Sequence, residues 1–454
     1  MTKLPEFSEP KSQQPASPSA DNDKQLAARK AALGILDTVL TRKTALDQAL
    51  DRSEEFKNLP DTRERAFARM IIATTLRRLG QIDEIIAKSI ANPTTTNALL
   101  QNILRLGATQ ILFMDVPDHA AVDTAVKLAG HHEMHRQTAF VNGVLRNITR
   151  TGKDLLSKQD ETRLNTPEWL LKIWIEDYGL KTAAQIAKAH LKEAPLDISI
   201  KDESSRNHWA SEFKATQIGA GSLRLTTGGS VTDLAGFDDG AWWVQDAAAA
   251  IPAKLFGDIK GKTVIDLCAA PGGKTIQLAA SGANVIAIDR SATRMKRLRE
   301  NLQRMKLNNK VEIVTSDAAQ WSSQDAPEYI LLDAPCSATG TIRRHPDVPH
   351  LKSPRDIEGL QNIQARILQN AFNILAPGGT LIYCTCSLQK SEGEHQIAAF
   401  LKNNPNAAKR TITAKEIGGL KDPITEEGDA RILPFHQAAT GGLDGFFISR
   451  IIKS

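Results

Sequence analysis

The sequence predicts a multidomain protein in which an all-α domain precedes a doubly wound α/β domain, with a small α+β segment between them. Apolar residues recur at helical spacing from about residue 25 to residue 150. After residue 260, short apolar strands alternate with helical segments, a pattern typical of a mostly parallel sheet covered by helices. The length of 454 residues accommodates two to four domains at roughly 100–200 residues each.

The amino-terminal part divides into a tail and a helical domain. Residues 1–24 contain four prolines and many Ser, Gln and Asp residues, which predicts a disordered tail. Residues 25–150 form the predicted helical domain, with breaks at 59–61, 92–94 and 116–118, and with Asp61 placed to cap the helix that follows. This domain has 17 basic and 13 acidic residues, and the whole chain has a net charge of +5.

Five arginines of the helical domain lie close together on one predicted helix and its end: Arg63, Arg65, Arg69, Arg77 and Arg78. A solvated helix face is the ordinary interpretation of such a charge run. A patch that contacts phosphates is the alternative, and the helix alone does not decide between them.

Residues 151–240 are predicted to be a linker and a small α+β subdomain. Amphipathic helices are expected at 167–179 and 182–192, and strand-like segments at 196–200 and 223–225. The Gly-rich stretch 219–229 is expected to be a loop.

Residues 241–454 form the predicted doubly wound domain. Strands are expected at 263–267, 285–289, 311–314, 329–333 and 380–383, and a last strand at 445–450 is expected to be antiparallel at the edge. In such sheets the ligand binds beyond the carboxyl ends of the strands. The functional residues are therefore sought where these strands end.

Composition excludes several classes of protein. No apolar run approaches the length of about 18 residues that a membrane span requires, and the amino end carries no secretory signal. The four cysteines all follow residue 260, which is no basis for a disulfide framework and suits the reducing cytoplasm. The four cysteines do not have the spacing of a metal site. The segment 131–135 is not an H-E-x-x-H motif. No metal is therefore predicted.

The first strand runs into a turn rich in small residues, at 268–274, which then opens a helix. Such a turn lets a nucleotide approach the backbone and the helix amino end, but the patterns of a phosphate loop and of a dinucleotide fingerprint are absent. Asp289 closes the second strand, where an acid can bind ribose hydroxyls, and Asp317 ends the third, where it could bind an adenine amino group. Each Asp alone could equally be a cap or turn residue, but the combination fits S-adenosylmethionine. The residues predicted to bind it are Cys268, Ala269, Ala270, Pro271, Gly272, Gly273, Lys274, Asp289, Asp317 and Asp333.

Two cysteines follow the ends of neighbouring strands. Cys336 comes shortly after the strand that ends at Asp333, and Cys386 follows the strand at 380–383. A lone cysteine is most often a small buried hydrophobe, which is the interpretation adopted for Cys268 and Cys384. The position of Cys336 and Cys386 at one mouth of the sheet, beside Asp333, indicates a chemical role instead.

The motifs at these strand ends resemble the signature blocks of RNA (cytosine-5) methyltransferases. The resemblance rests on the segments 245–246, 268–274, 333–340, 343–347, 385–387 and 444–447, and it covers about residues 165–454. The helical domain resembles NusB-type RNA-binding domains. In this order the two resemble the bacterial 16S ribosomal RNA cytosine-5 methyltransferase family, which implies a Rossmann-like domain, S-adenosylmethionine as methyl donor and cytosine 967 as the target.

The resemblance also implies roles for three residues. Cys386 would be the nucleophile that adds to C6 of the cytosine, because C5 is a poor nucleophile until a thiolate has added. Asp333 would hydrogen-bond or protonate the N3 edge, and Cys336 would assist elimination and product release. The target base must be unstacked to enter the site, which favours single-stranded or loop RNA as substrate. The expected partner is small-subunit ribosomal RNA before full assembly. The protein is expected to act as a monomer.

In this context phosphate contact becomes the favoured interpretation of the basic clusters. The helix after Asp289 carries seven basic residues against one acid, Glu300. The arginines predicted to contact RNA are Arg65, Arg69, Arg294, Arg297, Arg343 and Arg344.

Two other functions remain as alternatives. A transfer RNA cytosine-5 methyltransferase would use the same chemistry, although the helical domain favours ribosomal RNA. A non-catalytic RNA-binding factor of the antitermination type would not need Cys336, Cys386 and Asp333 together. A methyltransferase for exocyclic amines would usually carry Asn-Pro-Pro-Tyr after the fourth strand, where this chain has 333–336, Asp-Ala-Pro-Cys.

Overall fold

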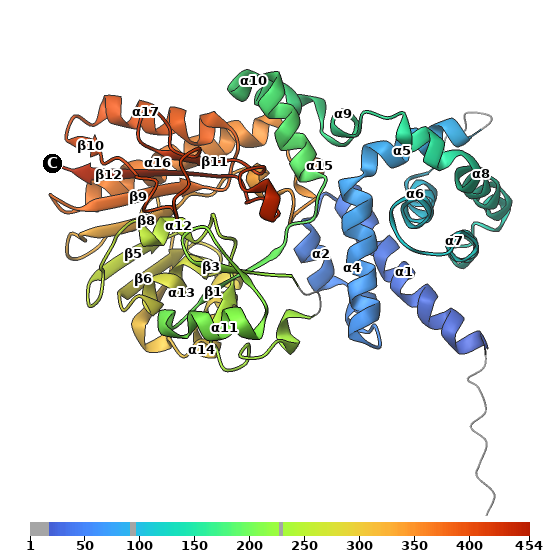
Figure 1. Ribbon diagram of the computed structural model, residues 1–454, viewed down its shortest axis with the longest axis horizontal. Coiled ribbons are helices and arrows are strands. Elements are labelled where there is room, and N and C mark those ends of the chain that lie inside the picture. Colours follow the sequence, from blue (N-terminus) through green and yellow to red (C-terminus); the bar gives the residue numbers. More distant parts are fainter. Residues whose placement is uncertain (1–17, 91–96, 227–229) are drawn as a thin grey trace, which may run out of the picture. The chain divides into compact units, whose positions relative to one another are not determined.

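The computed structural model describes residues 18–90, 97–226 and 230–454 (Figure 1). The chain forms two compact units, which are considered separately below. One contains the chain up to residue 75 together with residues 82–158, and the other contains residues 76–81 and 159–454. Most of the predicted tail and residues 227–229 of the predicted Gly-rich loop lie outside the described residues.

The first unit is all-helical, as predicted. Its core is built from residues at helical spacing such as Leu33, Leu36 and Ile103, each almost completely buried. The Asp61 carboxylate accepts a hydrogen bond from the Glu64 N–H at 2.8 Å, which confirms the predicted cap. The helices are α1 (Pro18–Leu40), α2 (Leu46–Arg52), α3 (Glu54–Lys57), α4 (Thr62–Arg77), α5 (Leu79–Ser89), α6 (Ala98–Phe113), α7 (Asp118–His131) and α8 (Thr138–Ser157), with the end of α4 and the start of α5 in the second unit.

The first and last helices of this unit reach beyond the predicted limits of the helical domain, residues 25 and 150. Helix α1 begins at Pro18, before the expected start at residue 25. Helix α8 continues to Ser157, past the expected boundary at residue 150. Gly152 lies inside this helix, and a side chain there would meet the Leu112 side chain at 2.8 Å. Among the described helices, none combines the length and the hydrophobicity needed to cross a bilayer.

The second unit opens with α9 (Glu161–Asn165) and α10 (Glu168–His190). Helix α10 contains the two helices expected at 167–179 and 182–192, which meet at Gly179 with a φ of 78° and a ψ of 161°. This left-handed φ is accessible to glycine at little cost and breaks the helix direction there.

A small antiparallel sheet follows, in the order β2 (Thr216–Ile218), β3 (Ser222–Leu225), β1 (Leu196–Ile200) and β4 (Trp242–Val244). Helix α11 (Arg206–Glu212) precedes β2. Ile198, Phe213, Leu223 and Trp242 form a separate hydrophobic core. The small α+β subdomain therefore extends to Val244, because β4 pairs with β1, whereas the predicted boundary fell at residue 240.

The large sheet has the order β10-β12-β9-β8-β5-β6-β7, with β11 paired to β12. The four central pairings are parallel, and β12 runs antiparallel beside β9. These strands are β5 (Thr263–Leu267), β6 (Asn284–Asp289), β7 (Val311–Thr315), β8 (Tyr329–Asp333), β9 (Thr380–Thr385), β10 (Ala407–Lys409), β11 (Ala430–Ile432) and β12 (Phe446–Lys453). The doubly wound, Rossmann-like fold and its antiparallel last strand are confirmed.

Helices cover both faces of the large sheet (Figure 1). They are α12 (Ile251–Lys254), α13 (Gly273–Ala280), α14 (Ala292–Arg304), α16 (Pro354–Ile374) and α17 (Glu394–Asn403), whereas Val348 of the short α15 (Val348–Leu351) packs in a core with residues of α10. Val264 of β5 packs with Ile276 and Leu298 in one core, and the next residue, Ile265, packs with Leu368 in the other. Strand residues alternate between the two faces, so a strand buried on both is apolar throughout.

Candidate active site

The carboxyl ends of the adjacent parallel strands β6, β5, β8 and β9 lie at one edge of the large sheet. Asp333, the last residue of β8, stands opposite Cys384 of β9 in the register, and Leu267 at the end of β5 stands opposite Leu332. Cys386 directly follows β9. The register thus brings the chemically active residues predicted from the strand ends into one region.

Cys336 and Cys386 lie together, with 3.5 Å between their sulfur atoms. Both are unbridged cysteines of intermediate exposure. The hydrogen bond to Cys386 and the burial of the thiol raise the pKa of Cys336 well above that of an ordinary thiol. Cys336 therefore keeps its proton at neutral pH.

The backbone around this pair is held by two glycines. The Gly340 N–H donates to the Cys386 carbonyl at 2.9 Å, and the Gly445 N–H donates to the Gly340 carbonyl at 2.8 Å. A side chain on Gly340 would lie 2.0 Å from the Gly445 carbonyl oxygen. Only glycine permits this close approach, which fixes the loop after Cys336 against the end of β9.

Lys274 and Asp333 form an ion pair beside the cysteines. The Lys274 ammonium lies 2.7 Å from one Asp333 carboxylate oxygen, and the other oxygen lies 3.6 Å from the Cys384 sulfur. Burial alone would lower the pKa of Lys274, but the Asp333 carboxylate outweighs it and raises that pKa. Lys274 is thus a permanent cation that neutralises and orients Asp333.

The turn between β5 and α13 adopts the strained shape that its small residues suggest. Cys268 has a φ of 63° and Gly272 a φ of 111°. A side chain on Gly272 would lie 2.3 Å from Leu298, so glycine lets α14 pack against the turn. Burial raises the pKa of the Cys268 thiol, and the same holds for Cys384, which fits their predicted role as unreactive buried groups.

Acidic residues surround this turn. Both Asp289 oxygens accept backbone hydrogen bonds, from Ala270 at 3.2 Å and from Ser291 at 2.9 Å. Asp317 is exposed after β7 and accepts a hydrogen bond from Ala319 at 2.9 Å. Burial, with the nearby acidic groups adding to it, raises the pKa of Asp266 to about 7. One Asp266 oxygen is buried without a hydrogen-bond partner among the described residues, which leaves an acceptor at the site.

Comparisons with known proteins match both parts of the chain. Residues 256–452 match the family "16S rRNA methyltransferase RsmB/F", and residues 26–150 match the NusB family. The Ribosomal RNA small subunit methyltransferase B of Klebsiella pneumoniae is 33% identical over 437 residues, which cover 90% of this chain and 96% of that protein. The chain belongs to the RsmB/F family of 16S rRNA methyltransferases.

Solved structures agree with this fold. The crystal structure of PH0851 covers 95% of this chain and 98% of its own, with a TM-score of 0.74 at 23% identity. NSun6 from Pyrococcus horikoshii, solved with SFG, covers 63% of this chain and 98% of its own, with a TM-score of 0.56 at 20% identity. As a member of a methyltransferase family with this fold, the RsmB/F protein uses S-adenosylmethionine as its cofactor. The residues of the turn and the unpartnered Asp266 oxygen fit such a group.

Two arginines that were predicted to contact RNA are structural in this RsmB/F chain. Arg343 is 2% exposed, and its guanidinium donates to the Leu443 and Gly441 carbonyls at 3.0 and 2.5 Å. Arg344 pairs with Asp246 at 2.7 Å and with Asp444 at 2.8 Å. The prediction that these two side chains reach out to phosphates is therefore wrong, because both are committed to holding the segments around the site together.

The other predicted RNA contacts lie nearer the surface. Arg294 is 54% exposed in its side chain, 3.5 Å from Asp289, and also donates to the Ala270 carbonyl. Arg297 is exposed on α14, whose opposite face is buried. In the helical unit, Arg65 donates to the Leu59 carbonyl at 2.9 Å, and Arg69 is exposed with its guanidinium 5.4 Å from the centre of the Phe56 ring.

Sequence reasoning missed a buried residue that supports both cysteines. Glu392 is completely buried, and its carboxylate accepts four hydrogen bonds. They come from the Ser337 N–H at 3.0 Å, the Ser337 hydroxyl at 2.5 Å, the Ser387 hydroxyl at 2.6 Å and the Gln364 amide at 2.9 Å. Ser337 follows Cys336 and Ser387 follows Cys386, so Glu392 ties the two cysteine loops to each other. An apolar-pattern search gives no signal for such a residue.

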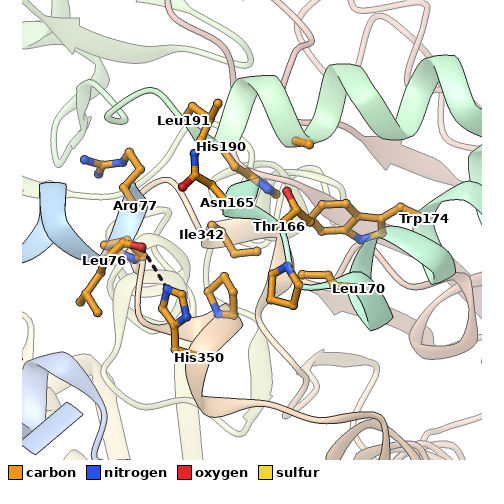
Figure 2. A pocket seen from close by; sticks show the side chains of 14 residues that line it. Leu76, Arg77, Asn165, Thr166, Leu170, Trp174, His190, Leu191, Ile342 and His350 are labelled. Carbon is orange, nitrogen blue, oxygen red and sulfur yellow. Dashed lines mark hydrogen bonds between the residues drawn. The ribbon is translucent and has the colours of Figure 1, made fainter. Parts of the chain in front are cut away.

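A small cavity of about 20 Å³ lies beside the loop that follows Cys336 (Figure 2). Figure 2 shows His190 and Trp174 on one side of it and His350, bonded to the Leu76 carbonyl, on the other. Burial lowers the pKa of His190 to about 3, so this imidazole is neutral at physiological pH. The cavity has room for about one water molecule, which is too small for a nucleotide.

Proposed function

We propose that this protein methylates C5 of a cytosine in 16S ribosomal RNA, cytosine 967, through a covalent bond between Cys386 and C6 of the base. The observation that carries the proposal is the pair of sulfur atoms 3.5 Å apart at the strand ends, next to Asp333. Two thiols and an acid are what a reaction needs when it must first add to the ring and later eliminate from it.

Cys386 acts as the nucleophile. Its sulfur attacks C6, the new S–C6 bond forms, and the electrons of the C5–C6 double bond move to C5, which becomes nucleophilic. Asp333 hydrogen-bonds or protonates the N3 edge and so draws charge from the ring. S-adenosylmethionine supplies a methyl group bonded to a positively charged sulfur, which is the electrophile that C5 attacks.

Cys336 acts in the second half of the reaction. After methylation, C5 carries a proton that must leave before the C5–C6 double bond can re-form. A base accepts this proton, the electrons of the C5–H bond re-form the C5–C6 double bond, and the S–C6 bond breaks, so that Cys386 leaves as a thiolate and the RNA is released. Cys336 keeps its own proton and lies 3.5 Å from Cys386, which suits a group that assists this departure.

The residues of the turn after β5 hold the cofactor. We assign this role to the segment 268–274 with Asp289, Asp317 and Asp333 at the neighbouring strand ends. Lys274 neutralises Asp333, which keeps the positively charged cofactor and the acid from forming an unproductive pair of their own. The NusB domain and the exposed arginines of α14 supply RNA contacts, on ribosomal RNA that is not yet fully assembled.

The test is methyl transfer from labelled S-adenosylmethionine to unmodified 16S rRNA and, separately, to transfer RNA. Wild type is compared with Cys386→Ala and Cys336→Ala, and the product is mapped with bisulfite. We expect one labelled cytosine in 16S rRNA, no label with Cys386→Ala, and a covalent RNA adduct with Cys336→Ala. Label in transfer RNA alone would contradict the substrate, and binding of RNA without any transfer would indicate a non-catalytic factor.

A further inference from the structure

A second cavity, separate from the small one beside His190, opens on the carboxyl-terminal half of α10. Its volume is about 280 Å³, several times the roughly 30 Å³ share of one liquid water. Its walls come from α10, from Arg343 and from the segment 434–442. The lining residues are Gln185, Lys188, Ala189, Lys192, Arg343, Pro434, Phe435, Ala438, Gly441 and Gly442.

The charge of this cavity has one sign. Lys188 is exposed in the last turn of α10, Lys192 is exposed just after this helix, and Arg343 contributes a buried guanidinium. Within the described parts of the chain, the lining contains three cations and no carboxylate. Such a concave, positively charged surface attracts an anion and concentrates it.

Arg343 lacks the acidic partners that its neighbour has. Arg344 forms ion pairs with Asp246 and Asp444, whereas the described contacts of Arg343 are to the carbonyls of Gly441 and Leu443. Its Nε is buried without a hydrogen-bond partner among the described residues. The Arg343 guanidinium stays on these carbonyls, and its charge adds to the positive potential of the cavity.

Phe435 adds an aromatic surface to this charge. It is partly buried, lines the cavity beside the two lysines, and is flanked by the His436 ring at 5.2 Å. Aromatic side chains next to basic ones are the usual platform for unpaired nucleotides, because every base can stack on a ring while its phosphate meets the cations.

Hydrogen bonds and the short segment 443–445 together connect the cavity to the nucleophile. Arg343 holds the Leu443 carbonyl, the Gly445 N–H holds the Gly340 carbonyl, and the Gly340 N–H holds the Cys386 carbonyl. We propose that this cavity binds one unpaired nucleotide of the substrate RNA other than the target cytosine, with the phosphate on Lys188 and Lys192 and the base on Phe435. This inference rests on the proposed function, since it assigns a further contact to the same RNA.

The test measures binding of the full-length protein to unmodified 16S rRNA at several salt concentrations. The variant Lys188→Ala/Lys192→Ala is compared with the control Lys172→Ala/Lys181→Ala. The control removes two exposed lysines of α10 that lie outside the cavity. Each phosphate contact contributes about 0.7 to the slope of log affinity against log salt for single strands. Because one phosphate is lost, we expect the cavity variant to lower this slope by about 0.7, to raise the KM for RNA and to leave kcat unchanged.

The variant Phe435→Leu tests base stacking separately, because it removes the aromatic ring without changing the charge of the cavity. It should weaken RNA binding by about fivefold or more, since stacking of one base has that effect, while the salt slope stays at the wild-type value. Salt slopes and affinities equal to those of the control pair would overturn the proposed cavity even if wild type methylates 16S rRNA. A changed slope together with no methyl transfer by wild type would instead retain the cavity and reject the proposed function.

Discussion

Removal of the Glu392 carboxylate is the perturbation that most directly tests how the two cysteines are held. Glu392 is neither a thiol nor in contact with a base in the proposed mechanism, and it acts only by bonding the residues that follow Cys336 and Cys386. We therefore treat it as a positioning residue. Glu392→Ala removes all four acceptor contacts, whereas Glu392→Gln keeps one carbonyl oxygen and nearly the same volume.

The size of the effect follows from which donors can find another partner. The Ser387 and Ser337 hydroxyls lie 2.6 and 3.1 Å from the Gln389 side-chain oxygen and can turn toward it. The Ser337 N–H and one hydrogen of the Gln364 amide have no such replacement among the described contacts. An unsatisfied buried donor costs about 1–3 kcal/mol, so Glu392→Ala should lower the free energy of unfolding by roughly 2–6 kcal/mol.

The assay separates positioning from stability. At a temperature where both variants are folded, kcat for methyl transfer and the pH profile of Cys386 alkylation are measured for wild type, Glu392→Gln and Glu392→Ala. We expect kcat to fall at least tenfold in the Ala variant, the alkylation profile to shift, KM for RNA to stay constant, and the Gln variant to recover most of both. A folded Ala variant with wild-type kcat and an unchanged alkylation profile would refute this role for Glu392.

Three further predictions concern other parts of the second unit. Gly340→Ala should abolish methyl transfer and lower the melting temperature, because the added carbon would meet the Gly445 carbonyl at 2.0 Å; full activity would contradict the close approach. Lys274→Met should lower the free energy of unfolding by about 1–3 kcal/mol in urea, because it leaves the Asp333 carboxylate without its partner; unchanged stability would contradict a structural role for this ion pair. His190 has a pKa of about 3 in the folded protein and about 6.5 when unfolded. The contribution of the neutral imidazole to the free energy of unfolding is therefore complete above pH 6.5 and is lost as the pH falls toward 3. Urea unfolding should therefore show wild type losing ~2 kcal/mol more than His190→Leu between pH 7 and pH 5, and parallel losses would contradict a neutral buried His190.

Much of the catalytic unit could be predicted because its signals are local. Each central strand is a short apolar run, and parallel strands place their carboxyl ends at one edge. Asp333 and Cys386 therefore had to meet once the strand order was that of a doubly wound sheet. Of the two cysteines interpreted as small buried hydrophobes, Cys384 is buried and Cys268 is partly exposed.

What could not be predicted depends on contacts between distant segments. Arg343 and Arg344 look like exposed basic residues in the sequence, and only the folded chain shows that carbonyls and acids about 100 residues away occupy them. Glu392 is one acid among 52 acidic residues until its four donors come together.

The measurement that tests the central claim most directly uses 16S rRNA in which cytidine is replaced by 5-fluorocytidine. Fluorine at C5 cannot leave as the proton does, so a reaction that has passed through addition and methylation should stop with the RNA still attached to the protein. We predict a stable adduct that appears only with S-adenosylmethionine and that peptide mass spectrometry assigns to Cys386. An adduct on Cys336 would reverse the roles of the two cysteines, and methyl transfer without any adduct would contradict the covalent mechanism.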